Sequence, residues 1–295
     1  MLIVLSASAQ VVSFQGLKQL NGTQLYVKII GKGEPILVVH GGPGLNQSYF
    51  FPHLNSLAKR YQLIFLDQRA SGQSATPAPD SISLDFLVAD MEALRSHLKL
   101  EKINILAHSW GAIPAVQYAL DYPKRLNKMI LCNPVALSTE YNPELTRLQQ
   151  KRMTKKDSID RVTLLNSASF KAGEAAAYKE LLLLSFRHAF YRPANLAKLN
   201  IEIPGNYTWA SRALFTGLGP DLSQYNYYPR LADCPTPVLI MHGAADMMPL
   251  KLQEQAKASF AKAFLLTFRN SGHFIFIEET ERFRKEVIGF LSPRK

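Results

Sequence analysis

Three residues of the types needed for nucleophilic catalysis follow apolar runs of the sequence, in the order serine, aspartate, histidine. Ser109 ends an apolar run that begins at residue 103, Asp246 follows the run 237–243, and His273 follows the run 263–268. A serine hydroxyl is a weak nucleophile until a histidine takes its proton, and that histidine must be oriented by a carboxylate. The sequence therefore predicts a triad in which Ser109 attacks a carbonyl carbon, His273 transfers the proton and Asp246 holds the imidazole.

The residues around Ser109 indicate how its side chain is presented. Small residues, Ala107 and Gly111, stand two positions before and after it. On a sharp strand-to-helix turn the backbone approaches itself so closely that only small residues fit there. Taken singly, Ser109 and Asp246 could each be a helix N-cap, and His273 could be an ordinary loop histidine. Their shared placement at strand ends favours the triad.

A glycine-rich string, His-Gly-Gly-Pro-Gly at residues 40–44, follows the apolar run 36–39. Such a loop leaves backbone N–H groups uncovered, as an oxyanion hole requires, although the string could also be a simple tight turn. We expect Gly42 to supply one donor and Trp110, immediately after the nucleophile, to supply the other. His40 is expected to pack beneath the loop.

The elements that must position these residues are strands alternating with helices. Residues 11–14 and 24–30 predict an antiparallel hairpin with its turn at Asn21-Gly22, and further strands are expected at 36–39, 61–66, 128–132 and in the apolar runs already described. Apolar residues at helical spacing between 84 and 98 predict a helix packed on the sheet. Strand–helix–strand alternation predicts a mostly parallel sheet with its ligand site at the carboxyl ends of the strands.

The segment 134–232 differs from the rest, because it is helical and aromatic and contains no strand-like run. An insertion of this size between two strands, entering and leaving at the catalytic edge, is typical of a lid that excludes water and shapes the pocket. We therefore expect a core in two parts, residues 11–133 and 233–295, with a helical cap at 134–232 between them. Most of the aromatic residues are expected to form the core of this cap.

Composition and charge exclude several classes of protein. With 295 residues, 47% hydrophobic and 19% charged, the chain is globular rather than disordered. The net charge of +11 favours anionic partners, but its basic residues are spread along the chain without a nucleic-acid recognition module. The densest basic run, residues 147–161, is expected to be a solvated helix face, so we predict no nucleic acid partner. No apolar stretch approaches the roughly 20 residues of a membrane span.

The compartment depends on the first ten residues and on the cysteines. An apolar patch followed by Ala-Ser-Ala-Gln at residues 7–10 is typical of the end of a signal peptide, which favours export to the periplasm or medium. The apolar part is short and lacks a basic start, so a cytoplasmic location stays the alternative. Cys132 and Cys234 are expected at opposite ends of the sheet, too far apart for a disulfide, and are predicted to be free thiols.

The conjunction of motifs resembles the proline iminopeptidases, which are α/β-hydrolase serine peptidases with a helical cap. The resemblance rests on HGGPG at 40–44, DQRASGQS at 67–74, HSWG at 108–111, Asp246, and SGHF at 271–274, and it covers residues 11–131 and 235–291. It implies the α/β-hydrolase fold, a catalytic triad of Ser109, Asp246 and His273, an oxyanion hole of Gly42 and Trp110, and release of an N-terminal proline without a metal or other cofactor.

The chain departs from the family pattern in ways that leave the substrate open. Ala70 replaces a glycine of the family's DQRGSG string, and His108 replaces a glycine of its GGSWG string. The Glu-Asn-His-Tyr-Phe string, whose glutamate helps to hold the substrate's amino group, has no counterpart here. Glu202 and Asp221 are the nearest available acids for that role.

Three functions remain possible from the sequence. The first is an aminopeptidase that removes N-terminal proline or another small residue, and the second is a carboxylesterase that acts on small acyl esters with the same triad. The third is a ligand-binding protein of the same fold without catalysis. Enzymes of this fold that need a carboxylate nucleophile are excluded by Ser109. The oligomeric state is left open.

Overall fold

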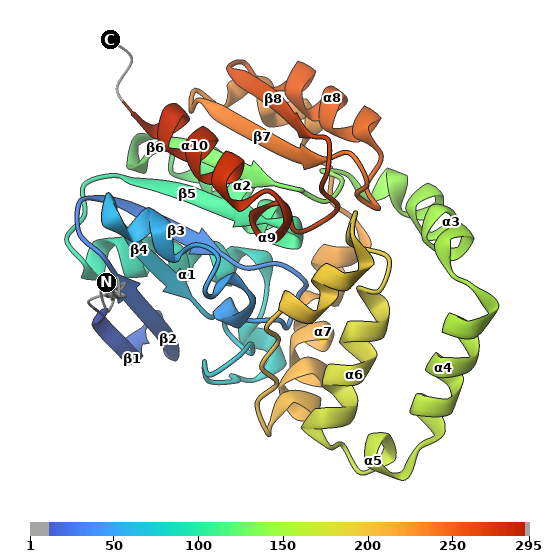
Figure 1. Cartoon of the computed structure of the whole chain (residues 1–295). Helices are drawn as coiled ribbons and strands as arrows, with labels where there is room; N and C mark the ends of the chain where they lie inside the picture. Colours follow the sequence, from blue (N-terminus) through green and yellow to red (C-terminus); the bar gives the residue numbers. More distant parts are fainter. Residues whose placement is uncertain (1–11, 293–295) are drawn as a thin grey trace, which may run out of the picture.

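An eight-stranded sheet forms the centre of the computed structural model, which describes residues 12–292 (Figure 1). The strands lie in the order β1-β2-β4-β3-β5-β6-β7-β8. The pairs β1/β2 and β2/β4 are antiparallel, and every other neighbouring pair is parallel. The strands are β1 (Val12–Leu20), β2 (Thr23–Ile30), β3 (Glu34–Val39), β4 (Tyr61–Leu66), β5 (Ile103–His108), β6 (Leu126–Cys132), β7 (Val238–Gly243) and β8 (Ala263–Phe268).

The antiparallel hairpin at the sheet edge turns at Asn21 and Gly22, as predicted, and both residues have positive φ angles of 44° and 74°. Its first strand was predicted at residues 11–14 and is in fact longer, because β1 continues to Leu20 and pairs with β2 throughout. Along an edge strand half of the side chains face water, so the polar residues of β1 do not prevent pairing. The apolar pattern of β1 is therefore too weak to predict the full length of the strand.

Helices cover both faces of the sheet (Figure 1). In β3 the side chains of Leu37 and Val39 join one buried cluster, and those of Ile36 and Val38 join the other. Because successive side chains of a strand point to opposite faces, a continuous apolar run is what a doubly covered strand requires. The helices on the first face include α1 (Leu84–His97), α2 (Ala112–Asp121) and α8 (Leu250–Ser259), and those on the second include α9 (Ile275–Glu278) and α10 (Thr280–Leu291).

The segment between β6 and β7, here called the helical insertion, spans residues 133–237. Its only strand-like contact among the described residues is an isolated bridge between Ser138 and Asn226. The basic run 147–161 forms two helices rather than one, because Thr154 starts the second of them with a capping box that includes Asp157. The helices are α3 (Asn142–Arg152), α4 (Lys155–Asn166), α5 (Ala168–Lys171), α6 (Ala175–Ser185) and α7 (Tyr207–Ser223).

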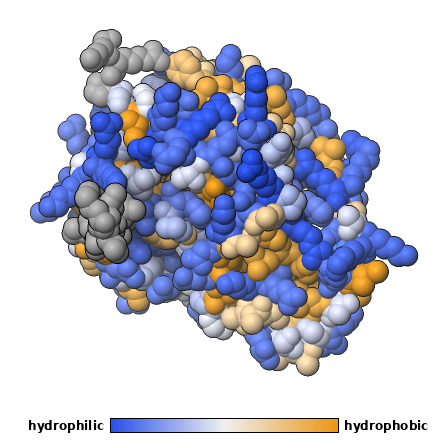
Figure 2. Space-filling model, viewed as in Figure 1, coloured by the Kyte–Doolittle hydropathy of each residue, from blue (hydrophilic) through white to orange (hydrophobic). Residues whose placement is uncertain are grey.

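The helical insertion carries exposed hydrophobic side chains. Ile159 and Val162 on α4 are more than half exposed, as is Trp209 on α7. Figure 2 shows hydrophobic side chains gathered over the lower part of the molecule, where Figure 1 places this insertion. None of the helices within residues 12–292 has the length and hydropathy needed to cross a membrane.

Cys132 and Cys234 are both buried and free, as predicted. The export signal predicted in residues 1–10 lies outside the described residues.

Candidate active site

Ser109 stands on a tight turn between β5 and α2. Its φ angle is +56°, a left-handed conformation that costs a non-glycine residue about 1–2 kcal/mol. The turn also brings it against the end of β3, since a Cβ atom on Gly111 would lie 2.6 Å from the carbonyl oxygen of His40. Gly111 must therefore remain glycine, and Ala107 on the other side of the serine is fully buried. This is the strained elbow expected from the small residues around Ser109.

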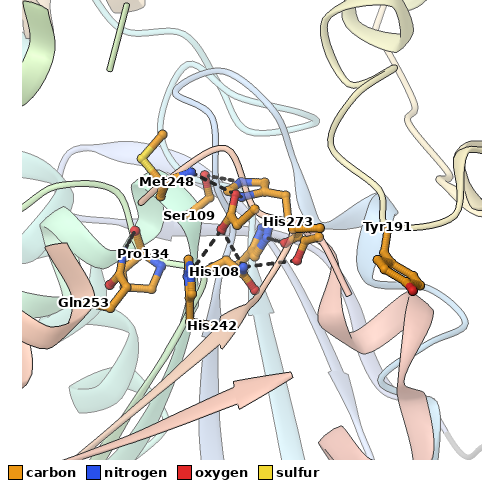
Figure 3. Close-up of polar contacts among 12 residues, drawn as sticks. His108, Ser109, Pro134, Tyr191, His242, Met248, Gln253 and His273 are labelled. Atoms are coloured by element: carbon orange, nitrogen blue, oxygen red, sulfur yellow. Dashed lines mark hydrogen bonds and ion pairs between the residues drawn. The ribbon is translucent and has the colours of Figure 1, made fainter. Parts of the chain in front are cut away.

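The structure brings Ser109, His273 and Asp246 together. The Oγ atom of Ser109 lies 2.8 Å from Nε2 of His273, and Nδ1 of His273 lies 2.9 Å from Oδ1 of Asp246. Because the carboxylate can only accept, Nδ1 carries the proton and Nε2 is free to accept from the serine hydroxyl. Figure 3 shows Ser109 and His273 pointing toward each other, whereas Tyr191 lies apart from them. Asp246 and His273 are each only 3% exposed.

Asp246 is held by Asn133, a residue that we did not assign to the site from the sequence. The Nδ2 atom of Asn133 donates to Oδ2 of Asp246 at 2.5 Å and to the carbonyl oxygen of Gly272 at 3.2 Å. The backbone N–H of Met248 donates to the other carboxylate oxygen at 3.3 Å. Asn133 directly follows β6 and has a positive φ of 46°. The sequence signal that could have identified it is a polar residue directly after an apolar strand.

The surroundings of Asp246 keep its carboxylate ionised. Burial is the largest single effect and would raise the pKa of Asp246, but His273, His242 and Asn133 together outweigh it. The pKa is lowered to about 2. Asp246 is therefore a charged acceptor for the histidine at neutral pH.

This shift predicts how stability depends on pH. Because the pKa of Asp246 falls from 3.8 to about 2 on folding, its ionised form stabilises the fold above about pH 4, and this contribution disappears as the pH falls toward 2. The shift corresponds to about 2 kcal/mol. We expect the difference in unfolding free energy between the wild type and Asp246→Asn to shrink by about that amount between about pH 5 and about pH 2, as measured by urea unfolding. An unchanged difference would contradict the lowered pKa.

The residues proposed for the oxyanion hole lie on the loop after β3 and on the turn that carries Ser109. Gly42 has a φ of +56°, and a Cβ atom there would lie 2.9 Å from the side chain of Leu45, so glycine is required. Trp110 lies in the first turn after Ser109, where backbone N–H groups have no partner within the helix. His40 packs beneath the loop, as expected, and accepts from the N–H of Gln68 at 3.0 Å.

The two acids considered for binding a substrate amino group have known surroundings. Asp221 accepts a hydrogen bond of 2.7 Å from the N–H of Leu84 at the start of α1. Glu202 lines a cavity of about 410 Å³ whose lining includes neither Ser109 nor His273. Among the described residues, no hydrogen bond connects either acid to the triad.

The fold and this arrangement define the class of protein. A family model described as the alpha/beta hydrolase fold matches residues 34–280, so the chain belongs to the α/β-hydrolase family, as its motifs predicted. Among relatives, the proline iminopeptidase of Lactobacillus delbrueckii subsp. bulgaricus is 28% identical over 288 residues, covering 91% of this chain and 94% of that protein. The proline iminopeptidase of Clostridioides difficile (strain 630) is 25% identical, covering 94% and 98%. The resemblance to proline iminopeptidases is thus confirmed.

The solved structures that share this fold include two kinds of hydrolase. The proline iminopeptidase of Mycobacterium smegmatis superposes with a TM-score of 0.70 at 20% identity, covering 94% of this chain and 97% of that one. An esterase from Exiguobacterium antarcticum gives a TM-score of 0.67 at 23% identity, covering 94% and 99%. At this identity the likeness shows the shared fold and does not choose between peptidase and esterase.

Proposed function

We propose that the protein is a serine hydrolase that works through an acyl-enzyme on Ser109. The observation that carries this proposal is the pair of hydrogen bonds, 2.8 Å and 2.9 Å long, that joins Ser109 through His273 to Asp246. This arrangement supplies the base and the orienting acid that a serine nucleophile needs. The left-handed turn at Ser109 presents its hydroxyl at the carboxyl edge of the sheet.

In the proposed mechanism His273 takes the proton of Ser109 as its Oγ attacks the substrate carbonyl. The backbone N–H groups of Gly42 and Trp110 would stabilise the negative oxygen that forms. His273 then gives the proton to the leaving group, whose bond to the carbonyl carbon breaks. Water activated by the same histidine attacks the acyl-enzyme, which releases the acid and restores Ser109.

Within this class, an aminopeptidase that releases N-terminal proline or another small residue is our first candidate. Its support is the set of proline iminopeptidases that match more than nine-tenths of the chain, together with the HGGPG and HSWG strings. Such an enzyme must bind a protonated amino group close to the scissile carbonyl, and a carboxylate is the natural partner for it. Glu202 and Asp221 remain the acids proposed for this role.

A small-molecule carboxylesterase is the second candidate, because one feature of the structure favours it. Both proposed acids make their observed contacts away from the triad. An esterase needs only the triad and the oxyanion donors.

Two measurements on the purified protein test these proposals. A fluorophosphonate should form an adduct that mass spectrometry locates at Ser109, since this reaction needs an activated serine. Initial rates on proline 4-nitroanilide and 4-nitrophenyl acetate then separate the candidates. Turnover of the anilide supports the aminopeptidase, and turnover of the ester alone supports the carboxylesterase. A protein that forms no adduct and hydrolyses neither compound would instead be a ligand-binding protein of this fold.

A further inference from the structure

A buried chain of hydrogen bonds runs through the residue that precedes the nucleophile. The N–H of Gly41 donates to the phenolic oxygen of Tyr49 at 2.5 Å, and that oxygen lies 3.0 Å from Nδ1 of His108. The Nε2 atom of His108 lies 2.9 Å from the carbonyl oxygen of His273. Tyr49 and His108 are 1% and 2% exposed. The chain therefore links the loop after β3, the nucleophile turn and the loop of the catalytic histidine.

The direction of every bond in this chain follows from its ends. A carbonyl oxygen can only accept, so Nε2 of His108 carries a proton and donates to His273. Burial, together with the nearby His273, lowers the pKa of His108 to about 3, so the ring is neutral and Nδ1 must accept. Burial raises the pKa of Tyr49, whose hydroxyl thus stays protonated and donates to Nδ1. The hydroxyl of Tyr49 thus accepts from Gly41 and donates to His108, and each nitrogen of the His108 ring has one partner.

One end of the chain orients the predicted oxyanion loop. The N–H of Gly41 is directed at Tyr49, so it is not available to a substrate. The next backbone amide in the sequence is that of Gly42. The fit is close, since a Cβ atom on Gly41 would lie 2.8 Å from Cβ of Ser109 and 3.3 Å from Nδ1 of His108. A shift of this loop would therefore displace its donors relative to Ser109.

The other end orients the loop of the catalytic base. The carbonyl oxygen of His273 accepts from Nε2 of His108. The backbone N–H of His273 donates to the carbonyl oxygen of Ala189 in the helical insertion at 2.7 Å. Both polar groups of this residue's backbone are thus fixed. Its ring is consequently held at hydrogen-bonding distance from Ser109.

We propose that Tyr49 and His108 are positioning residues that hold the oxyanion loop and the base loop in place around Ser109. This proposal rests on the proposed serine hydrolase function. Neither side chain contacts the reacting atoms in the proposed mechanism, so their contribution lies in the placement of Gly42 and His273. A small misplacement of such groups slows catalysis by up to about a hundredfold.

The variant Tyr49→Phe removes the hydroxyl while keeping the ring. We expect kcat to fall by about thirtyfold, with KM changed less than about twofold, because the groups that act in the transition state are displaced while the pocket remains. The matched control is Tyr118→Phe, in which a fully buried tyrosine of α2 loses a hydroxyl that donates to Glu92 at 2.8 Å. The control should lose thermal stability but not kcat. Equal kcat values in the two variants would overturn the proposal.

Two substitutions of His108 separate its hydrogen bonds from its bulk. The side-chain amide in His108→Gln can donate to one neighbour and accept from the other, whereas His108→Leu can do neither. We expect the glutamine variant to keep kcat within about tenfold of the wild type and the leucine variant to fall well below it. Similar losses of kcat in both variants would show that His108 contributes through its packing alone, which would contradict the proposed role of its hydrogen bonds.

Hydrogen–deuterium exchange tests the placement without any assay of activity. In Tyr49→Phe, peptides that cover residues 40–45 and 270–274 should exchange faster than in the wild type and in Tyr118→Phe, because the two loops share one chain of bonds. Unchanged exchange in either loop rejects the proposal. If the wild type formed no adduct at Ser109, the proposed function would fail, while the exchange result would still decide whether this chain positions the loops.

Discussion

The Ser109→Ala variant is expected to hydrolyse the substrate of the wild type about 10⁵-fold more slowly, which corresponds to about 7 kcal/mol of transition-state stabilisation. Without Oγ no acyl-enzyme forms, and His273 has no hydroxyl to deprotonate at the 2.8 Å position. A residual rate above that in water should remain, because the oxyanion donors and the binding pocket persist. Initial rates at several substrate concentrations, together with fluorophosphonate labelling, provide the measurement.

The fold of this variant should be preserved, which makes the loss of activity interpretable. Alanine adopts the left-handed conformation of Ser109 about as poorly as serine does, so the melting temperature should stay within a few degrees of the wild type, about 3 °C at most. Ser109→Gly serves as a second control, because glycine relieves the strain. It should be equally inactive and more stable than Ser109→Ala by about 1 kcal/mol. Substantial activity in either variant would refute the assignment of Ser109 as the nucleophile.

The Asp246→Asn variant is expected to lose about 10⁴-fold in kcat, because it favours the wrong tautomer of His273. In the wild type, one carboxylate oxygen accepts from Nδ1 of His273 and the other accepts from Asn133. An asparagine has only one acceptor oxygen, whereas three N–H groups donate here, because the N–H of Met248 also reaches the oxygen that faces His273, at 3.3 Å. If the oxygen of the asparagine faces Asn133, its amide nitrogen faces His273, so Nδ1 must accept and Nε2 carries the proton. The histidine then cannot act as a base toward Ser109.

The opposite orientation of the introduced amide would bring two amide nitrogens into contact, and Asn133 could relieve this only by turning away from Gly272. Kinetics and the ¹⁵N chemical shifts of the imidazole of His273 together check the prediction. The shifts should show protonation moving from Nδ1 to Nε2. Asp121→Asn, at the end of α2, is the control for loss of a carboxylate and should keep kcat. A loss of less than about tenfold in Asp246→Asn would show that Asp246 is not the orienting acid.

Much of the fold could be predicted from the chain, because its signals are local. Continuous apolar runs identified strands that are covered on both faces, and β3 divides its side chains between the two clusters as that pattern requires. Small residues around Ser109 indicated the strained turn, and the order of Ser109, Asp246 and His273 along the chain indicated the triad. The apolar runs and the turn depend on hydrophobic burial or sterics within a few residues, and the triad was indicated because each of its members follows such a run. The extent of β1 was missed because an edge strand needs no apolar face pattern.

The hydrogen-bond partners of the triad residues depend on the order of the strands. Asn133 lies 113 residues from Asp246, and His108 lies 59 residues from Tyr49 and 165 from the carbonyl group of His273 that it contacts. A sequence motif identifies residues that can form hydrogen bonds. Whether two of them do so depends on their atoms lying about 3 Å apart at a suitable angle. That distance is set by the packing of β3, β5, β6 and β7 side by side. The packing of α7 against the start of α1 placed Asp221 there, a contact that no local pattern contains.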